Sequence, residues 1–160
     1  MLYQPKTLSI MATVFDVAAY ILEKMGEVTT WKLQKLVYYS QAWSLVWDDQ
    51  PLFEEEIQAW INGPVCPALY KKHKGYFKIY KIPNGDRDAL DEDQKETVNA
   101  VLRFYGNKSS QWLSDLTHME GPWKKARQGL QPGVRGSSPI SLESMAEYYE
   151  SLMEDDTLSE

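Results

Sequence analysis

One cysteine and two histidines are the residues of this chain best suited to nucleophilic or acid–base chemistry. His118 stands two residues before Glu120, which is the H-x-E spacing of zinc deaminases, but the P-C-x-x-C segment of those enzymes is missing. Cys66 lies next to a predicted turn with no basic residue close in sequence, so we interpret it as a small buried apolar residue. His118 falls near the end of a predicted helix, where contact with helix carbonyls is the more natural role.

The patterns of metal and phosphate sites are absent as well. Four aspartates between 86 and 93 could attract a hard cation, but the EF-hand spacing and its closing glutamate are missing. The glycines are scattered, and none has the spacing of a phosphate-binding loop. We therefore expect no catalytic residue, no cofactor and no metal, and the sequence predicts a protein that is not an enzyme.

Composition places the chain among single-domain globular proteins. Its 160 residues are 43% hydrophobic and 25% charged, which suits one compact core and argues against general disorder. No apolar run is long enough to span a membrane, and residues 1–13 lack the apolar core of a signal peptide, so we expect a cytoplasmic protein. The unusual feature is 6 Trp and 10 Tyr in a chain of net charge -6, and composition does not say whether those rings form a core or a binding surface.

Hydrophobic spacing predicts two helices in the N-terminal third. Thr13, with Asp16 three residues later, resembles a capping box, and an apolar stripe runs from there to Met25. The second helix is predicted over 30–47 and is apolar nearly all round, which is typical of a central buried helix. Its polar residues must lie either at the rim of the core or in a buried polar network; they are Lys32, Gln34, Lys35 and Gln41.

Shorter elements follow. Alternation predicts a strand over 57–61, ended by an Asn-Gly-Pro turn, and a second strand over 77–82. Prolines, caps and apolar stripes predict further helices over 67–74, 92–105, 109–119 and 122–128, and a last helix from 141. The expected fold class is mainly α (α+β): a compact helical domain with a central buried helix and a small β element.

Charge is segregated along the chain. Residues 71–81 contain five lysines and no acid, whereas residues 141–160 contain seven acids and no base. A second basic group is formed by Lys124, Lys125, Arg127 and Arg135. These stretches are either solvated faces that keep the domain soluble or surfaces for a charged partner. Aromatic residues alternate with the lysines of the first stretch, a mixture that can bind single-stranded nucleic acid, but the acidic balance of the chain argues against that partner.

Three ordered motifs resemble those of a known family. Residues 32–43 are similar to its K-L-Q-K-L-x-Y-Y-x-Q motif, residues 59–65 to its A-W-x-x-G-P-V motif, and residues 116–123 to its L-x-H-x-x-x-P-W motif. The family is the Panacea, or SocA-like, antitoxin domain family, which includes phage-associated GepA-like proteins. The residues that carry the resemblance are Lys32, Leu33, Lys35, Leu36, Tyr38, Tyr39, Gln41, Trp60, Gly63, Pro64, Val65, Tyr70, His118, Pro122 and Trp123.

The resemblance implies an antitoxin of a bacterial or phage toxin–antitoxin module that neutralises a cognate protein toxin by direct binding, with the toxin encoded by the adjacent gene. It divides the chain into an extension (1–12), the domain (13–153) and an acidic tail (154–160), which we expect to fray. Two alternatives stay open. One is a nucleic-acid-binding regulator in which 29–43 is part of a helix-turn-helix, and the other is an adaptor that delivers a bound protein to a protease or chaperone.

The aromatic residues divide between core and surface. Aromatic residues at helical spacing are usually core, so Trp43, Trp112 and Trp60 are expected there, with Trp123 closing a short helix against it. Tyr148 and Tyr149 are expected at the surface. The candidate partner-binding residues are Tyr70, Lys71, Lys72, Lys74, Tyr76, Phe77, Tyr80, Lys124, Lys125 and Arg127.

Overall fold

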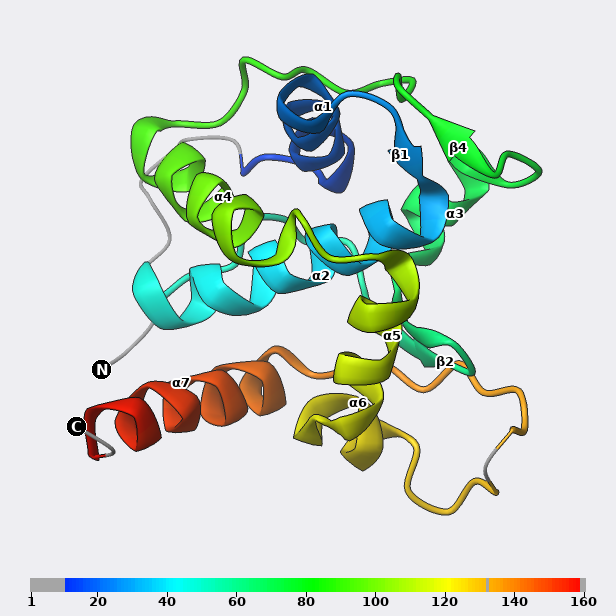
Figure 1. Cartoon of the computed structure of the whole chain (residues 1–160), viewed down its shortest axis with the longest axis vertical. Helices are drawn as coiled ribbons and strands as arrows, with labels where there is room; N and C mark the ends of the chain where they lie inside the picture. Colours follow the sequence, from blue (N-terminus) through cyan, green and yellow to red (C-terminus); the bar gives the residue numbers. More distant parts are fainter. Residues whose placement is uncertain (1–10, 132, 159–160) are drawn as a thin grey trace.

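One long helix runs through the centre of the molecule, and the other elements are arranged around it (Figure 1). The computed structural model describes residues 11–131 and 133–158, the last four by their backbone alone. Over these residues the chain is mainly helical with two small sheets, which confirms the mainly α (α+β) fold class. In chain order the elements are α1 (Val14–Met25), β1 (Val28–Thr29), α2 (Thr30–Trp47), β2 (Gln58–Trp60), β3 (Gly63–Val65), α3 (Pro67–His73), β4 (Lys78–Ile79), α4 (Glu92–Tyr105), α5 (Ser110–Met119), α6 (Gly121–Ala126) and α7 (Leu142–Leu158).

The first two helices begin where the sequence predicts. The Asp16 backbone N–H donates to the Thr13 hydroxyl at 3.2 Å, and the Thr13 N–H donates to the Asp16 carboxylate at 2.9 Å, so the predicted capping box is present. At the start of α2, the hydroxyl of Thr29 accepts from the N–H of Lys32 at 3.2 Å. Every residue of α2 from Leu33 to Ser44 is buried, so α2 is the central buried helix that its all-round apolar sequence predicts.

The two sheets are antiparallel and very short. β1 pairs with β4, with Val28 opposite Ile79. β2 and β3 form a hairpin, and the strand predicted over 57–61 is confirmed in β2. The strand ends before the predicted Asn-Gly-Pro turn, and Gly63–Val65, for which no strand was predicted, turns back and pairs with β2. The strand predicted over 77–82 is shortened to Lys78–Ile79.

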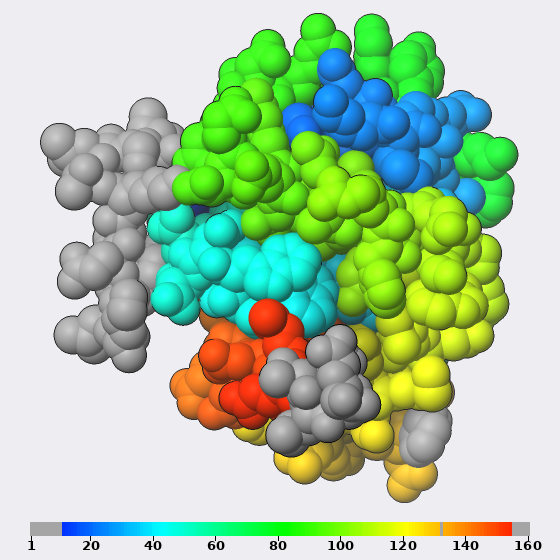
Figure 2. All heavy atoms as spheres, turned by 60° about the vertical axis from the view of Figure 1, so that its left-hand side comes forward, coloured from blue at the N-terminus to red at the C-terminus, as the bar shows by residue number. Residues whose placement is uncertain are grey.

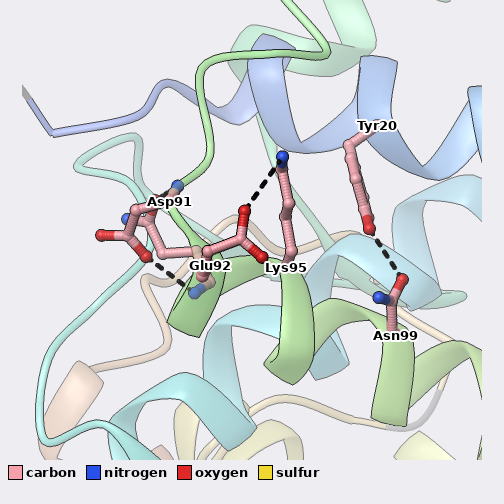
Figure 3. Close-up of polar contacts among 6 residues, drawn as sticks. Tyr20, Asp91, Glu92, Lys95 and Asn99 are labelled. Atoms are coloured by element: carbon pink, nitrogen blue, oxygen red, sulfur yellow. Dashed lines mark hydrogen bonds and ion pairs between the residues drawn. The ribbon is translucent and has the colours of Figure 1, made fainter.

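Helix α4 is attached to the N-terminal part of the fold. Asp91 caps it, because the Gln94 N–H donates to the Asp91 carboxylate at 2.9 Å, and Glu92 lies 3.6 Å from the ammonium of Lys95 (Figure 3). The hydroxyl of Tyr20 on α1 donates to the side-chain carbonyl of Asn99 on α4 at 2.9 Å (Figure 3). The Tyr20–Asn99 hydrogen bond joins α4 to α1, and α4 also packs against α2.

The C-terminal end of α2 reaches the surface between α4 and α7 (Figure 2). Trp43, one helical turn before this end, is 9% exposed, as predicted for a core residue, and it stacks on Trp47 with ring centroids 4.9 Å apart. Trp47 itself is 43% exposed. The core thus extends along α2 until its last turn.

Three expectations about the C-terminal half are corrected. Trp112 was expected in the core but is 42% exposed, because α5 buries the face that carries Leu113 and Thr117. Trp60 lies on β2, within the strand predicted over 57–61, but it is only half-buried instead of being a core residue. The tail was expected to fray from Glu154, whereas the α7 backbone continues to Leu158. None of the described helices is long and apolar enough to cross a membrane.

Candidate functional site

Two glutamines on the buried face of α2 hold the backbone of segments that follow it. The Gln34 side-chain carbonyl accepts from the Cys66 N–H at 2.9 Å, and its amide donates to the Cys66 carbonyl at 3.3 Å. Gln41, two turns later, accepts from the Leu52 N–H at 2.7 Å and donates to the Phe53 carbonyl at 2.9 Å. Buried backbone groups outside helices and sheets need such partners. The polar residues of α2 therefore include a buried network, one of the two predicted alternatives.

Lys35 lies between these glutamines and is completely buried. Its ammonium donates to the Pro64 carbonyl at 3.2 Å and stands 5.2 Å from the ring centroid of Trp31. Burial lowers the pKa of Lys35 to about 7, and no carboxylate in the described part of the chain pairs with it. A Cβ added at Gly63 would lie 2.6 Å from Cε of Lys35, so the glycine gives the lysine its space.

The third motif holds the β2–β3 hairpin from the other side. The indole N–H of Trp123 donates to the Trp60 carbonyl at 2.8 Å, and Nε2 of His118 lies 2.9 Å from the Ile61 carbonyl. Nδ1 of His118 faces the Ser114 carbonyl inside α5, which agrees with the predicted contact to helix carbonyls. The ring centroids of His118 and Trp123 are 4.1 Å apart. These two side chains join α5 and α6 to the turn of the hairpin.

A buried carboxylate joins α2, α7 and the α5–α6 junction. Oε1 of Glu120 accepts from the hydroxyl of Tyr39 at 2.7 Å and from the hydroxyl of Tyr149 at 2.8 Å. The Tyr149 hydroxyl also lies 3.0 Å from the hydroxyl of Tyr38. Burial raises the pKa of Glu120, and the two tyrosine hydrogen bonds oppose that rise. Tyr149 was expected at the surface; it is fully buried because Glu120 supplies an acceptor for its hydroxyl.

The motif residues are thus mostly interior. His118, Tyr70, Trp60, Trp123 and Lys32 are half-buried. The remaining motif residues are buried: Leu33, Lys35, Leu36, Tyr38, Tyr39, Gln41, Gly63, Pro64, Val65 and Pro122. A partner could reach few of these side chains without unfolding the domain.

The exposed candidates lie elsewhere, on what we call the basic–aromatic segment (residues 71–81). Its three outward-facing rings are 65%, 71% and 65% exposed; they belong to Tyr76, Phe77 and Tyr80. All five of its lysines are exposed: Lys71, Lys72, Lys74, Lys78 and Lys81. Within the segment only His73 and Ile79 are buried. The segment therefore combines apolar rings and positive charge in contact with solvent.

The second basic group is divided by the structure. Lys124 and Lys125 are exposed on α6, as predicted. Arg127 was expected on the partner-binding surface, but it is only 7% exposed. Its guanidinium donates to the Ala59 carbonyl at 3.0 Å and to the Val134 carbonyl, so it anchors the loop before α7 to β2. Sequence spacing could not show this, because both acceptors are backbone carbonyls.

Comparison with known proteins matches these motifs to one family. The model of the antitoxin SocA-like, Panacea domain family covers residues 33–124, more than half of the chain. The chain belongs to this family. It is also 29% identical to antitoxin SocA of Caulobacter vibrioides (strain NA1000 / CB15N) over 135 residues, which are 74% of this chain and 71% of that protein. No solved structure matches the chain.

In this Panacea domain the helix-turn-helix alternative is not supported. A recognition helix must present side chains to the major groove. The stretch 29–43 instead lies in β1 and α2, and all of its residues from Leu33 onward are buried.

The cysteine considered as a nucleophile in the sequence is also enclosed, because Cys66 is 1% exposed and burial raises the pKa of its thiol to about 11. Cys66 is the small buried residue that the sequence predicts.

Replacing Gly63 by alanine should destabilise the Panacea domain by roughly 2–4 kcal/mol, because φ is positive there and the added methyl collides with Lys35. Gly75 is the matched control: its φ is +93°, and nothing lies within 4 Å of an added Cβ, so Gly75→Ala should cost only about 1 kcal/mol of backbone strain. Urea unfolding of both variants tests the difference. Equal losses would contradict the close fit between Gly63 and Lys35.

Proposed function

We propose that this chain is the antitoxin of a toxin–antitoxin module, and that it neutralises a cognate protein toxin, the product of the adjacent gene, by direct binding. Membership of the antitoxin SocA-like family supports the role. The distribution of the motif residues supports the mode of action, since their side chains build the interior rather than a reactive cleft. A protein that acts by binding needs an exposed surface with well-positioned anchors.

The basic–aromatic segment has such anchors. Its backbone is fixed by the N–H of Thr30, which donates to the Phe77 carbonyl at 2.9 Å, and by the Thr30 hydroxyl, which donates to the Tyr76 carbonyl at 3.1 Å. Ile79 pairs with Val28 and points inward. The exposed rings therefore stand on a held backbone, and little conformational entropy is lost when they are covered. Exposed aromatic rings in this setting are typical interface anchors.

Charge gives the segment a preferred kind of partner. Five lysines and no acid within eleven residues make it locally positive in a chain of net charge -6. An acidic surface on the toxin would be attracted to this segment and repelled by the rest of the antitoxin, which orients the encounter. Lys124 and Lys125 on α6 are the second exposed basic group and are proposed as minor contacts.

The test is co-expression of the adjacent gene product with wild-type chain and with a triple variant, Tyr76→Ser, Phe77→Ser and Tyr80→Ser. We expect the wild type to restore growth. The triple variant should fail to restore it, because its affinity for the toxin should fall at least about 100-fold: each buried anchor typically contributes about 1–2 kcal/mol or more. Phe104→Ser with Met119→Ser is the control, since these side chains are 64% and 66% exposed elsewhere on the surface. Growth that is restored by neither wild type nor control, although both are folded, would overturn the proposal.

A further inference from the structure

A groove with aromatic walls opens beside the β2–β3 hairpin, and two of its walls are half-buried motif residues, Trp60 and Tyr70. It has a volume of about 560 Å³ and is walled by Trp31 from α2, Trp60 from β2 and Tyr70 from α3. Asn62 in the hairpin turn, together with Arg135 and Ser137 from the loop before α7, completes its polar rim. Aromatic walls with a few polar groups are typical of a binding site, and the volume exceeds that of a single side chain.

The walls of this groove are held in place before anything binds. The indole N–H of Trp60 donates to the side-chain carbonyl of Gln58 at 2.9 Å, and its ring meets Tyr70 edge-on with centroids 5.0 Å apart. The loop that carries Arg135 is held against β2 by two contacts. The Ala59 N–H donates to the Ser138 carbonyl at 2.8 Å, and Arg127 donates to the carbonyls of Ala59 and Val134. A rigid aromatic groove loses little entropy on binding.

Among the residues that line the groove, Arg135 carries the one charged side chain. Arg135 is exposed and has no ion-pair partner among the described residues, and no acidic residue lines the walls. Behind the Trp31 wall lies the buried amine of Lys35, 5.2 Å from the ring centroid and without a carboxylate partner in the described chain. A ligand that brings a carboxylate to this groove would pair with Arg135, whose guanidinium has no acidic partner among the described residues.

We propose that the groove receives a short acidic segment of a partner protein, with one large apolar side chain between the aromatic walls and a flanking carboxylate on Arg135. The inference rests on the proposed function only for the identity of the partner, which would then be the toxin. A nucleotide is the less suitable ligand, because the groove offers a single guanidinium for a phosphate.

The test uses two blocked tripeptides, Glu-Trp-Glu and Lys-Trp-Lys, titrated into the ¹⁵N-labelled full chain while the indole N–H resonances are followed. We expect Glu-Trp-Glu to shift the resonances of Trp31 and Trp60 and to bind at least tenfold more tightly than Lys-Trp-Lys. Arg135→Glu should remove that preference, whereas Arg103→Glu, the same charge change on exposed α4, should keep it. Assignment comes from Trp31→Phe and Trp60→Phe.

Three results of these titrations would overturn the inference. Equal binding of the two peptides, or shifts confined to other indoles, would remove the groove as an acidic-peptide site. Tighter binding of adenosine monophosphate than of Glu-Trp-Glu would assign the groove to nucleotides. Concentration-dependent shifts of the same two resonances without peptide would assign it to a second copy of this chain. If the tripeptide result holds but the adjacent gene product does not bind, the proposed function fails and the groove remains.

Discussion

Replacing Glu120 by alanine is expected to lower the free energy of unfolding by roughly 2–4 kcal/mol, because it removes the shared acceptor of two buried tyrosine hydroxyls. The Tyr149 hydroxyl can still pair with Tyr38 at 3.0 Å, but the Tyr39 hydroxyl loses the only hydrogen bond described for it. An unsatisfied buried hydroxyl costs its full desolvation. Chemical denaturation followed by tryptophan fluorescence measures the loss.

Glu120→Gln is the matched control, since its side-chain carbonyl can accept both hydroxyls without a buried charge. The pKa of Glu120 is raised by burial, so the folded state binds more protons than the unfolded state at pH values above the ordinary value of 4.5 and below the raised pKa. Wild-type stability should therefore fall, relative to Glu120→Gln, as pH rises through that window. At neutral pH the free energy of unfolding of Glu120→Gln should equal or exceed that of the wild type. If Glu120→Gln is as unstable as Glu120→Ala, the role of the Glu120 carboxylate as a hydrogen-bond acceptor is contradicted.

Replacing Lys35 by methionine is expected to stabilise the domain at pH 7 by roughly 1–4 kcal/mol, because a buried unpaired ammonium gives way to an apolar chain of similar shape. The pKa of Lys35 falls from 10.5 in the unfolded chain to about 7 in the fold. The unfolded state therefore binds more protons between these values, and wild-type stability rises with pH across them. The advantage of Lys35→Met should be largest at and below pH 7 and should fall towards zero as pH rises to 10.5.

Two comparisons isolate the Lys35 effect. Lys72→Met changes an exposed lysine and should alter stability by less than about 0.5 kcal/mol at any pH. His73 is the other titratable group coupled to Lys35, and its pKa is lowered, so measurements above pH 7 avoid its titration. A Lys35→Met variant that is less stable than wild type at pH 7, with a parallel pH profile, would show that the amine is not an uncompensated charge.

Local signals predicted the helices well. The capping box at Thr13, the cap at Asp91 and the proline at Pro67 each mark a helix start that the structure has. These signals lie within a few residues of the boundary they set, so one segment is enough to identify them. The buried character of α2 was equally visible, because no face of it is polar.

Contacts between distant segments were not predictable in the same way. β1 has two residues and exists because it pairs with β4, fifty residues later in the chain. Arg127 resembles a surface base in sequence, yet carbonyls of Ala59 and Val134 bury it. Tyr149 resembles a surface ring until Glu120 provides its acceptor. In each case the partner is a group whose position only the tertiary fold determines.

The candidate site shows the same division. The motif residues identified the family, but their side chains explain the interior: Gln34 and Gln41 hold backbone, and Lys35 fits under Gly63. The exposure of the three rings in the basic–aromatic segment was predicted correctly. They lie among lysines and belong to no apolar stripe at helical spacing, so no core position was expected for them.

The most direct test of the proposed function is isothermal titration of the purified adjacent gene product with the purified chain at 0.15 M salt. Direct neutralisation predicts a complex of fixed stoichiometry whose affinity falls at least about 100-fold in the Tyr76→Ser, Phe77→Ser, Tyr80→Ser variant, with the unfolding free energy of that variant unchanged. The opposite result is heat of binding that is absent for wild type, or identical for wild type and the triple variant. The first would reject direct binding, and the second would reject the basic–aromatic segment as its surface.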